Sequence, residues 1–281
     1  MSVVWCIFSG AGCILFPAGA RAQAEERMAC GKYAGYHDLL YRDKEYTGEA
    51  RYLQALLARH APGAGELLEL GCGTGGLAAA LAAEGFTVHG VDRSEEMLAF
   101  AWERARTEPR LSFSCADIRE LPPGRAFPAI VSCFRVFSLF TQTEDLVAAS
   151  RAAAARLAGG GMLLFDFWYG PGVLSCRPGV KIRRFGNELL RVVRIEEPEL
   201  HPERNCLSLF CETLIEDIEL QRLSRCEETQ VLRYFFLPEL ETLLGRAGLE
   251  LVEPLSWLDT ERRPDPEDWY ALVVARKGGK P

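Results

Sequence analysis

The 281-residue sequence is poor in histidine, in paired cysteines and in long apolar runs. No two of its four histidines have the spacing that places metal ligands on one helix face, which disfavours a histidine-rich metal enzyme. None of its ten cysteines forms a C-x-x-C pair, which excludes zinc-ribbon and thioredoxin-like motifs. We therefore expect no metal site, and we interpret the cysteines as buried apolar residues in a reducing compartment.

Basic residues are also fewer than acidic ones, which gives the chain a net charge of -7. An acidic surface repels phosphate backbones, so we expect no nucleic-acid partner. Apolar residues make up 48% of the chain and charged residues 25%, which excludes a disordered chain, a collagen-like chain and a coiled coil. The length allows one large domain, or one domain with an insertion.

Residues 1–30 are predicted to be a leader or a mis-assigned start without stable structure. Residues 3–17 are apolar, but they are interrupted by S-G-A-G and are too short to cross a bilayer. Ala22-Gln23-Ala24 is compatible with signal-peptidase cleavage, yet no Lys or Arg precedes the apolar stretch. We therefore expect a cytoplasmic protein without a membrane segment, with export by a signal peptide as the alternative.

The middle of the chain alternates short apolar runs with helical patterns, which predicts an α/β fold with a parallel sheet and helices on both faces. The expected strands are 66–70, 86–91, 111–115, 129–134 and 162–167. The expected helices are 36–60, 75–83, 94–106 and 144–158. We assign residues 31–167 to this core and its helical cover.

The pattern changes at residue 168, where apolar and polar residues begin to alternate in the manner of an antiparallel sheet. The strands expected there are 180–185, 189–196, 206–219 and 228–236. Residues 168–237 are thus predicted to be a β-rich insertion. Residues 238–281 would complete the core with a helix over 238–247 and strands over 248–252 and 269–275.

The strongest motif, L-L-E-L-G-C-G-T-G-G, begins at Leu67 between the first strand and its helix. Its glycines let the backbone approach a ligand, and the helix start offers free N–H groups. The G-x-G-x-x-G spacing alone also fits a nicotinamide-dependent dehydrogenase. However, Glu69 would repel a pyrophosphate, and Asp92, at the end of the next strand, suits a ribose diol. Two such acids favour a nucleoside with a cationic tail, as in S-adenosylmethionine.

With these residues the sequence resembles the class I S-adenosylmethionine-dependent methyltransferases from about residue 33 to 167 and in the last two strands. E-L-G-C-G-T-G matches their first motif, V-D-R-S-E-E-M-L the second, and Ala116-Asp117-Ile118 resembles the third. The resemblance implies a Rossmann-like seven-stranded sheet whose last strand is antiparallel.

The resemblance also implies roles for individual residues. Asp92 would bind the ribose hydroxyls, Arg93 and Met97 would lie beside the adenine, Asp117 would accept from its amino group, and the Ile118 N–H would serve the ring. Tyr41 and Lys44, in an amino-terminal covering helix, would reach the methionine carboxylate. The full set predicted for the cofactor is Glu69, Gly71, Cys72, Gly73, Asp92, Arg93, Met97, Asp117, Ile118, Phe134, Tyr41 and Lys44.

The methyl acceptor is expected beyond the carboxyl ends of the fourth and fifth strands. The predicted pocket residues are Arg135, Phe137, Trp168 and Tyr169. No Asn/Asp-Pro-Pro-Tyr motif follows the fourth strand, which argues against nucleobase and glutamine N-methyltransferases. Cys133 is not followed by proline, which disfavours an RNA cytosine methyltransferase with a covalent cysteine.

Placement of the insertion and the R-Y-F-F-L-P-E-L run from Arg233 resemble bacterial small-metabolite methyltransferases, including amino-sugar N-methyltransferases. The sequence therefore predicts in-line methyl transfer to an N or O of a small molecule, with the insertion as a cap that also dimerises some family members. His201, within the cap, is the candidate general base. The alternatives are a non-catalytic binding or regulatory protein of this fold and, less favoured, the dehydrogenase.

Overall fold

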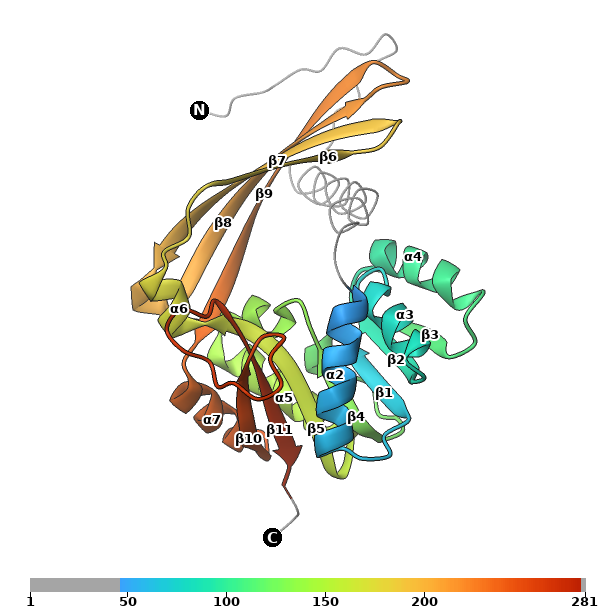
Figure 1. Cartoon of the computed structure of the whole chain (residues 1–281), viewed down its shortest axis with the longest axis vertical. Helices are drawn as coiled ribbons and strands as arrows, with labels where there is room; N and C mark the ends of the chain where they lie inside the picture. The colour runs from blue at the N-terminus through green and yellow to red at the C-terminus, as the bar shows by residue number, and fades with distance from the viewer. Residues whose placement is uncertain (1–45, 279–281) are drawn as a thin grey trace, which may run out of the picture.

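The computed structural model describes residues 46–278, which form a layered α/β core and a projecting β-sheet (Figure 1). The core strands are β1 (Glu66–Leu70), β2 (Thr87–Asp92), β3 (Leu111–Cys115), β4 (Phe127–Ser132), β5 (Leu157–Tyr169), β10 (Leu249–Ser256) and β11 (Tyr270–Lys277). The helices around them are α2 (Tyr46–His60), α3 (Gly76–Ala83), α4 (Glu95–Ala105), α5 (Thr143–Arg156) and α7 (Leu237–Arg246).

The core strands pair in the order β3-β2-β1-β4-β5-β11-β10, with β1 to β5 parallel. The last strand, β11, runs antiparallel to both of its neighbours. The expected seven-stranded sheet with an antiparallel last strand is therefore confirmed.

Helices cover both faces of this sheet, as the strand–helix alternation predicts. On one face α5 and α7 pack through Leu146 and Leu243 against inward side chains of β5 such as Phe165. On the other face α2 and α3 pack through Leu53 and Leu77. The apolar residues alternate between the two faces along each strand, so both sides of the sheet are sealed from water.

Strand β5 is longer than predicted and belongs to both parts of the molecule. It begins at Leu157, which pairs with Phe127, and residues 158–161 form an irregularity in the pairing before Met162 pairs with Ala129. Its other end pairs with β9, with Trp168 opposite Tyr234. The carboxyl end of β5 is thus the junction between the core and the projecting sheet.

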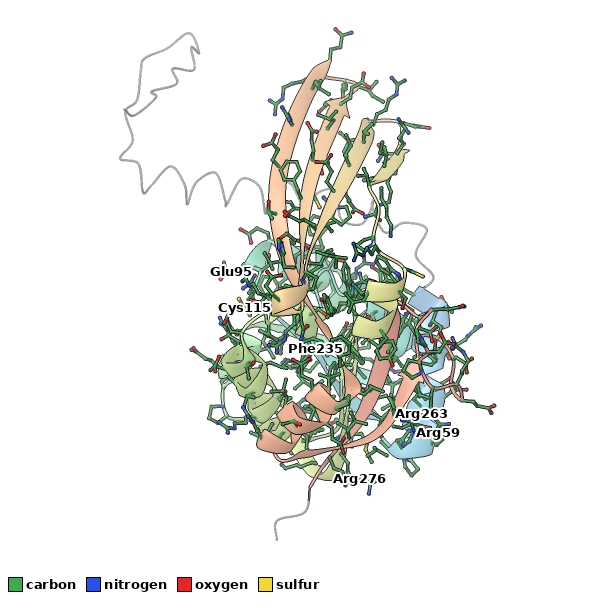
Figure 2. The ribbon with its side chains drawn as sticks, turned by 90° about the vertical axis from the view of Figure 1, so that its left-hand side faces the viewer. Arg59, Glu95, Cys115, Phe235, Arg263 and Arg276 are labelled. Atoms are coloured by element: carbon green, nitrogen blue, oxygen red, sulfur yellow. The ribbon has the colours of Figure 1, made fainter. Side chains whose placement is uncertain are left out.

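The projecting sheet has the expected antiparallel order β6-β7-β8-β9. Its strands are β6 (Lys181–Gly186), β7 (Leu190–His201), β8 (Cys206–Asp217) and β9 (Arg222–Phe235), and the short helix α6 (Gly170–Ser175) precedes them. We call these four strands the cap sheet. In Figure 2, Phe235 marks where β9 enters the core, and Glu95 and Cys115 mark the core edge nearest the cap sheet.

Three short 3-10 turns complete the described chain: Ile118–Glu120, Val136–Leu139 and Pro202–Arg204. Glu95 follows β2 and Cys115 ends β3, so the edge that faces the cap sheet is formed by the carboxyl ends of the parallel strands. This is the edge at which open α/β sheets bind ligands.

Packing of α6 on the segment before β11 generates the first prediction. A Cβ on Gly172 would lie 1.8 Å from the carbonyl oxygen of Asp268, so alanine there forces the backbones apart. We expect Gly172→Ala to lower the free energy of unfolding by about 1–3 kcal/mol, the usual cost of overpacking. Gly179→Ala is the control, because a Cβ there meets nothing within 4 Å. Urea denaturation of both variants measures the difference, and equal stability would contradict the contact.

Candidate cofactor and acceptor site

The glycine motif forms the turn between β1 and α3 at the edge facing the cap sheet. The N–H groups of Gly71 and Cys72 both donate to the carbonyl of Val91, at 2.7 and 3.1 Å, which fastens the turn to the end of β2. Gly71 has a φ of +74° and a Cβ there would lie 2.5 Å from Val136. Gly71 is therefore needed for packing inside the protein, as well as for backbone conformation.

Gly73 differs from Gly71 in what surrounds it. Its φ is +53°, but a Cβ there would meet no atom within 4 Å. The backbone of the turn is thus open to a ligand at this residue, which is the geometry expected of a loop that a cofactor approaches closely.

The carboxylate of Asp92 links the turn to β2 and α4. Its Oδ2 accepts from the N–H of Gly73 at 2.9 Å, and its Oδ1 accepts from the N–H of Ser94, also at 2.9 Å. A carboxylate has about four lone-pair directions, so each oxygen can accept a further hydrogen bond from a bound hydroxyl. Asp92 is partly exposed beside the turn, where its predicted ribose contact would be made.

Glu69 and Asp92 lie at one place in the structure. Glu69 is 2% exposed at the carboxyl end of β1. Burial raises the pKa of the Cys72 thiol, and the negative charges of Glu69 and Asp92 raise it further. Both carboxylates are therefore within electrostatic reach of one sulfur atom. The two acids that select the cofactor in the sequence interpretation are neighbours across the glycine turn.

Residues of the second motif form the start of α4. Ser94 caps this helix by accepting from the N–H of Met97 at 3.2 Å. Arg93 is exposed and Met97 is half-buried, next to the buried Leu98. Arg104, further along α4, donates to the carbonyl of Thr74 at 2.9 Å and so holds the helix against the glycine turn, a contact that no sequence motif signals.

Asp117 has a clear local role in the fold. Its side chain accepts from the Arg119 N–H at 2.8 Å and pairs with the Arg119 guanidinium at 2.7 Å. These hydrogen bonds hold the pKa of the Asp117 carboxyl below its usual range. Arg119 also reaches Asp145 on α5 at 3.0 Å, while Ile118 is buried in the core. The predicted contacts of Asp117 and Ile118 with adenine stay predictions.

On the acceptor side, the turn after β4 has an unusual backbone. Phe134 and Arg135 have φ values of 69° and 60°, in the left-handed region. The Arg135 N–H donates to Oδ1 of Asp166 at 2.6 Å, and this buried carboxylate holds the turn. The Phe134 ring lies 5.8 Å from that of Tyr46 on α2, and the Arg135 guanidinium lies 5.0 Å above the ring of Tyr270.

Two of the predicted pocket residues do not line a pocket. Phe137 is 0% exposed and stacks on Phe165 at 4.3 Å, so it belongs to the core. Tyr169 is 8% exposed and packs with Phe167 in the same core layer. Side chains alternate along a strand, so Tyr169 points to the α5 face while Trp168 points away from it.

Trp168 lies on the other side of the strand, outside that core layer. It packs in a cluster at the base of the cap sheet with Leu207, Leu232 and Tyr234. Its ring lies 6.5 Å from that of Tyr270, its register partner on β11. Tyr270 thereby joins the site from the far end of the chain, and the sequence reasoning missed it because only sheet register brings it there.

The structure does not bring His201 to this site. His201 pairs with Cys206 and bonds Oγ of Ser208 at 2.8 Å through its Nε2. Alternation along β7 places it on the opposite face of the cap sheet from Leu200, which packs beside Trp168. The prediction of His201 as a base facing the acceptor is therefore wrong. Tyr41 and Lys44 lie outside the described residues.

Within residues 46–278, no group of three or more His, Cys, Asp or Glu side chains is arranged to hold a metal ion. No helix in the same range is both long and apolar enough to cross a membrane.

The environment of Cys72 generates the second prediction. Since burial and two carboxylates raise its pKa, the thiol remains protonated and unreactive at pH 8. In the native protein we expect iodoacetamide to modify Cys72 at less than about a tenth of the rate at Cys115, which is exposed. Peptide mass spectrometry over a time course measures both rates, and urea-unfolded protein is the control in which the difference should vanish. Fast native labelling of Cys72 would contradict this geometry.

Comparisons with known proteins agree with this geometry. Residues 67–161 match a family model described as a methyltransferase domain. A dTDP-3-amino-3,4,6-trideoxy-alpha-D-glucopyranose N,N-dimethyltransferase from Streptomyces venezuelae is 33% identical over 141 residues, which cover 50% of this chain and 58% of the relative. A related N,N-dimethyltransferase from Streptomyces fradiae is 34% identical over 143 residues, covering 50% and 55%. The chain thus matches a little over half the length of these curated relatives.

Solved structures extend the likeness beyond the matched half. Streptomyces venezuelae DesVI superposes with a TM-score of 0.71 at 25% identity, covering 86% of this chain and 97% of DesVI. The sugar N-methyltransferase KedS8 from Streptoalloteichus has a TM-score of 0.73 at 23% identity, covering 99% and 100%. Residues 67–161 thus match a methyltransferase domain, and the fold as a whole is similar to that of S-adenosylmethionine-dependent methyltransferases.

Proposed function

We propose that this protein transfers a methyl group from S-adenosylmethionine to the amino nitrogen of a small-molecule sugar acceptor. The observation that carries the proposal is that Glu69 and Asp92 both lie near Cys72 of an open glycine turn, on the edge that faces the cap sheet. The amino-sugar acceptor is the finer part of the proposal. It is supported by the two curated relatives, which are named as N,N-dimethyltransferases of amino sugars.

The residues at the turn fit this cofactor. The open backbone at Gly73 leaves space that a Cβ would fill, and Asp92 has acceptor capacity toward a ribose diol. Glu69 supplies negative charge near the cationic methionine end. Met97 and Ile118, with Arg93 and Asp117, are our proposed adenine contacts. When bound, the cofactor supplies a methyl group on a sulfonium, which is already activated for displacement by a nucleophile.

The protein's own contribution is then alignment and exclusion of water. The turn after β4 contacts Tyr46 through Phe134 and Tyr270 through Arg135, and in this proposal it positions the two ligands relative to each other. The buried carboxylate of Asp166 fixes that turn. An amine that has lost its proton is a sufficient nucleophile, and the fold then needs no general base for the transfer itself.

We propose the same domain organisation that the sequence suggests, with residues 31–167 as core and cover, 168–237 as an acceptor cap and 238–281 completing the core. The cap sheet begins next to Trp168 and rises over the ligand-binding edge, which supports its role as a cover (Figure 1). Dimerisation through the cap sheet and a cytoplasmic location are further parts of this proposal.

Cofactor binding is the third prediction. Gly73→Ala adds a methyl group into the open side of the turn, and we expect it to weaken S-adenosylhomocysteine binding by more than about tenfold. Gly63→Ala is the matched control, because Gly63 also has a positive φ and open surroundings but lies outside the turn. Both variants carry a similar left-handed strain of about 1–2 kcal/mol.

Asp92→Ala should abolish binding as well, since it removes both the ribose acceptor and the bond to Gly73. Isothermal titration calorimetry measures all three variants. Wild-type affinity in Gly73→Ala and Asp92→Ala would place the cofactor elsewhere. Formation of S-adenosylhomocysteine with a panel of nucleotide-linked amino sugars then tests the acceptor, and binding without turnover on any acceptor would favour a non-catalytic role.

A further inference from the structure

Near the glycine turn, two cationic side chains lie over a group of three aromatic rings. The rings of Trp168, Trp269 and Tyr270 lie 5.8 to 6.5 Å apart, centre to centre. The Arg135 guanidinium lies 5.0 Å from the centre of the Tyr270 ring, and the Lys181 ammonium lies 5.4 Å from that of Trp269. The two cations come from separate elements, the turn after β4 and the first strand of the cap sheet. We call these five side chains the cation–aromatic cluster.

Trp168 supplies an independent sign of a ligand at this cluster. It is 7% exposed, and within residues 46–278 its indole N–H is buried without a hydrogen-bond acceptor. A buried donor without a partner costs about 1–3 kcal/mol. The indole therefore offers a donor to a bound oxygen atom.

The carboxylates of Glu196 and Asp268 are bound to other groups. Glu196 lies opposite Lys181 in register, but Arg194 donates to it at 3.0 Å and Arg183 also pairs with it. Asp268 receives two hydrogen bonds of 2.7 Å from Arg262. Within residues 46–278 Lys181 makes no ion pair. In a chain with a net charge of -7, the cluster is thus a local site where positive charge is presented to a ligand.

The position of the cluster connects it to methyl transfer. Arg135 follows Phe134, whose ring contacts Tyr46 beside the start of α3. It precedes Val136, which packs on Gly71 of the glycine turn. Consecutive residues of this turn therefore contact the glycine turn and Tyr270: Val136 packs on Gly71, and the Arg135 guanidinium lies over the Tyr270 ring. A molecule bound by the cluster lies next to the cofactor, at the base of the cap sheet.

From these contacts we propose that Arg135 and Lys181 bind the phosphate groups of a nucleoside diphosphate-linked acceptor, with the Trp168 indole N–H as a third donor. This inference rests on the proposed function and names the part of the acceptor that the cluster recognises. Arg and Lys are suited to phosphate oxygens, and Arg adds a planar set of donors. Because Lys181 belongs to the cap sheet and Arg135 to the core, a diphosphate held by both ties the two together around the acceptor.

The test is calorimetric titration of the full chain, saturated with S-adenosylhomocysteine, with thymidine diphosphate, inorganic pyrophosphate and thymidine. We expect thymidine diphosphate to bind, pyrophosphate to bind more weakly, and thymidine without phosphates not to bind. Arg135→Gln and Lys181→Gln should each weaken thymidine diphosphate binding by about tenfold, with a smaller loss at high salt. Arg191→Gln is the control, because Arg191 is an exposed cation at the far end of the cap sheet.

Arg135→Lys keeps the positive charge but removes the planar set of donors. We expect it to bind thymidine diphosphate more tightly than Arg135→Gln and less tightly than the unmodified protein. S-adenosylhomocysteine binding, measured in the same variants, should not change. If thymidine diphosphate fails to bind, binds both glutamine variants as tightly as the unmodified protein, or binds no better than thymidine, the diphosphate site is refuted while cofactor binding still stands. If the unmodified protein does not bind S-adenosylhomocysteine at all, the proposed function is refuted instead.

Discussion

The hydrogen bond from the Gly73 N–H to the Asp92 carboxylate joins the two halves of the cofactor site. A bond to an ionised acceptor is stronger than one between neutral groups, contributing on the order of 1.5–3 kcal/mol. Here it fixes the glycine turn against the end of β2 while the same carboxylate also holds the start of α4. The shape of the ligand-binding edge therefore depends on this one side chain, which shares the negative charge there with Glu69.

The second constraint is the long strand β5, which joins the core to the cap sheet. Its first part pairs with β4 and β11 and its last two residues pair with β9. Because side chains alternate, Asp166 and Trp168 lie on the face of β5 opposite to Phe167 and Tyr169, which fill the core. The same strand thus supplies the buried carboxylate that fixes the turn after β4 and the aromatic base of the cation–aromatic cluster.

The local sequence pattern predicted most of the fold, and the predictions that were wrong have identifiable causes. The core strands and helices of the described residues are found within a few residues of their expected positions, because each is long enough to show its own period. Residues 36–45 of the first expected helix lie outside the described range. Strand β5 begins earlier than predicted, because Leu157 already pairs with Phe127, ahead of an irregularity that contains the glycines 159–161. Phe137 and Tyr169 were assigned to the pocket from their proximity to strand ends, and His201 from its chemistry. None of these arguments takes into account the direction in which the side chain points.

The sequence alone determined the fold class and the cofactor-binding turn, because a glycine motif between a strand and a helix and two acids at fixed strand ends are local properties of the chain. Only the tertiary structure decided which residues face the acceptor. Arg135, Lys181 and Tyr270 are far apart in the sequence, and they meet because β11 pairs with β5 and the cap sheet starts beside both. Sheet register and strand alternation act over long sequence separations, and no local pattern specifies them.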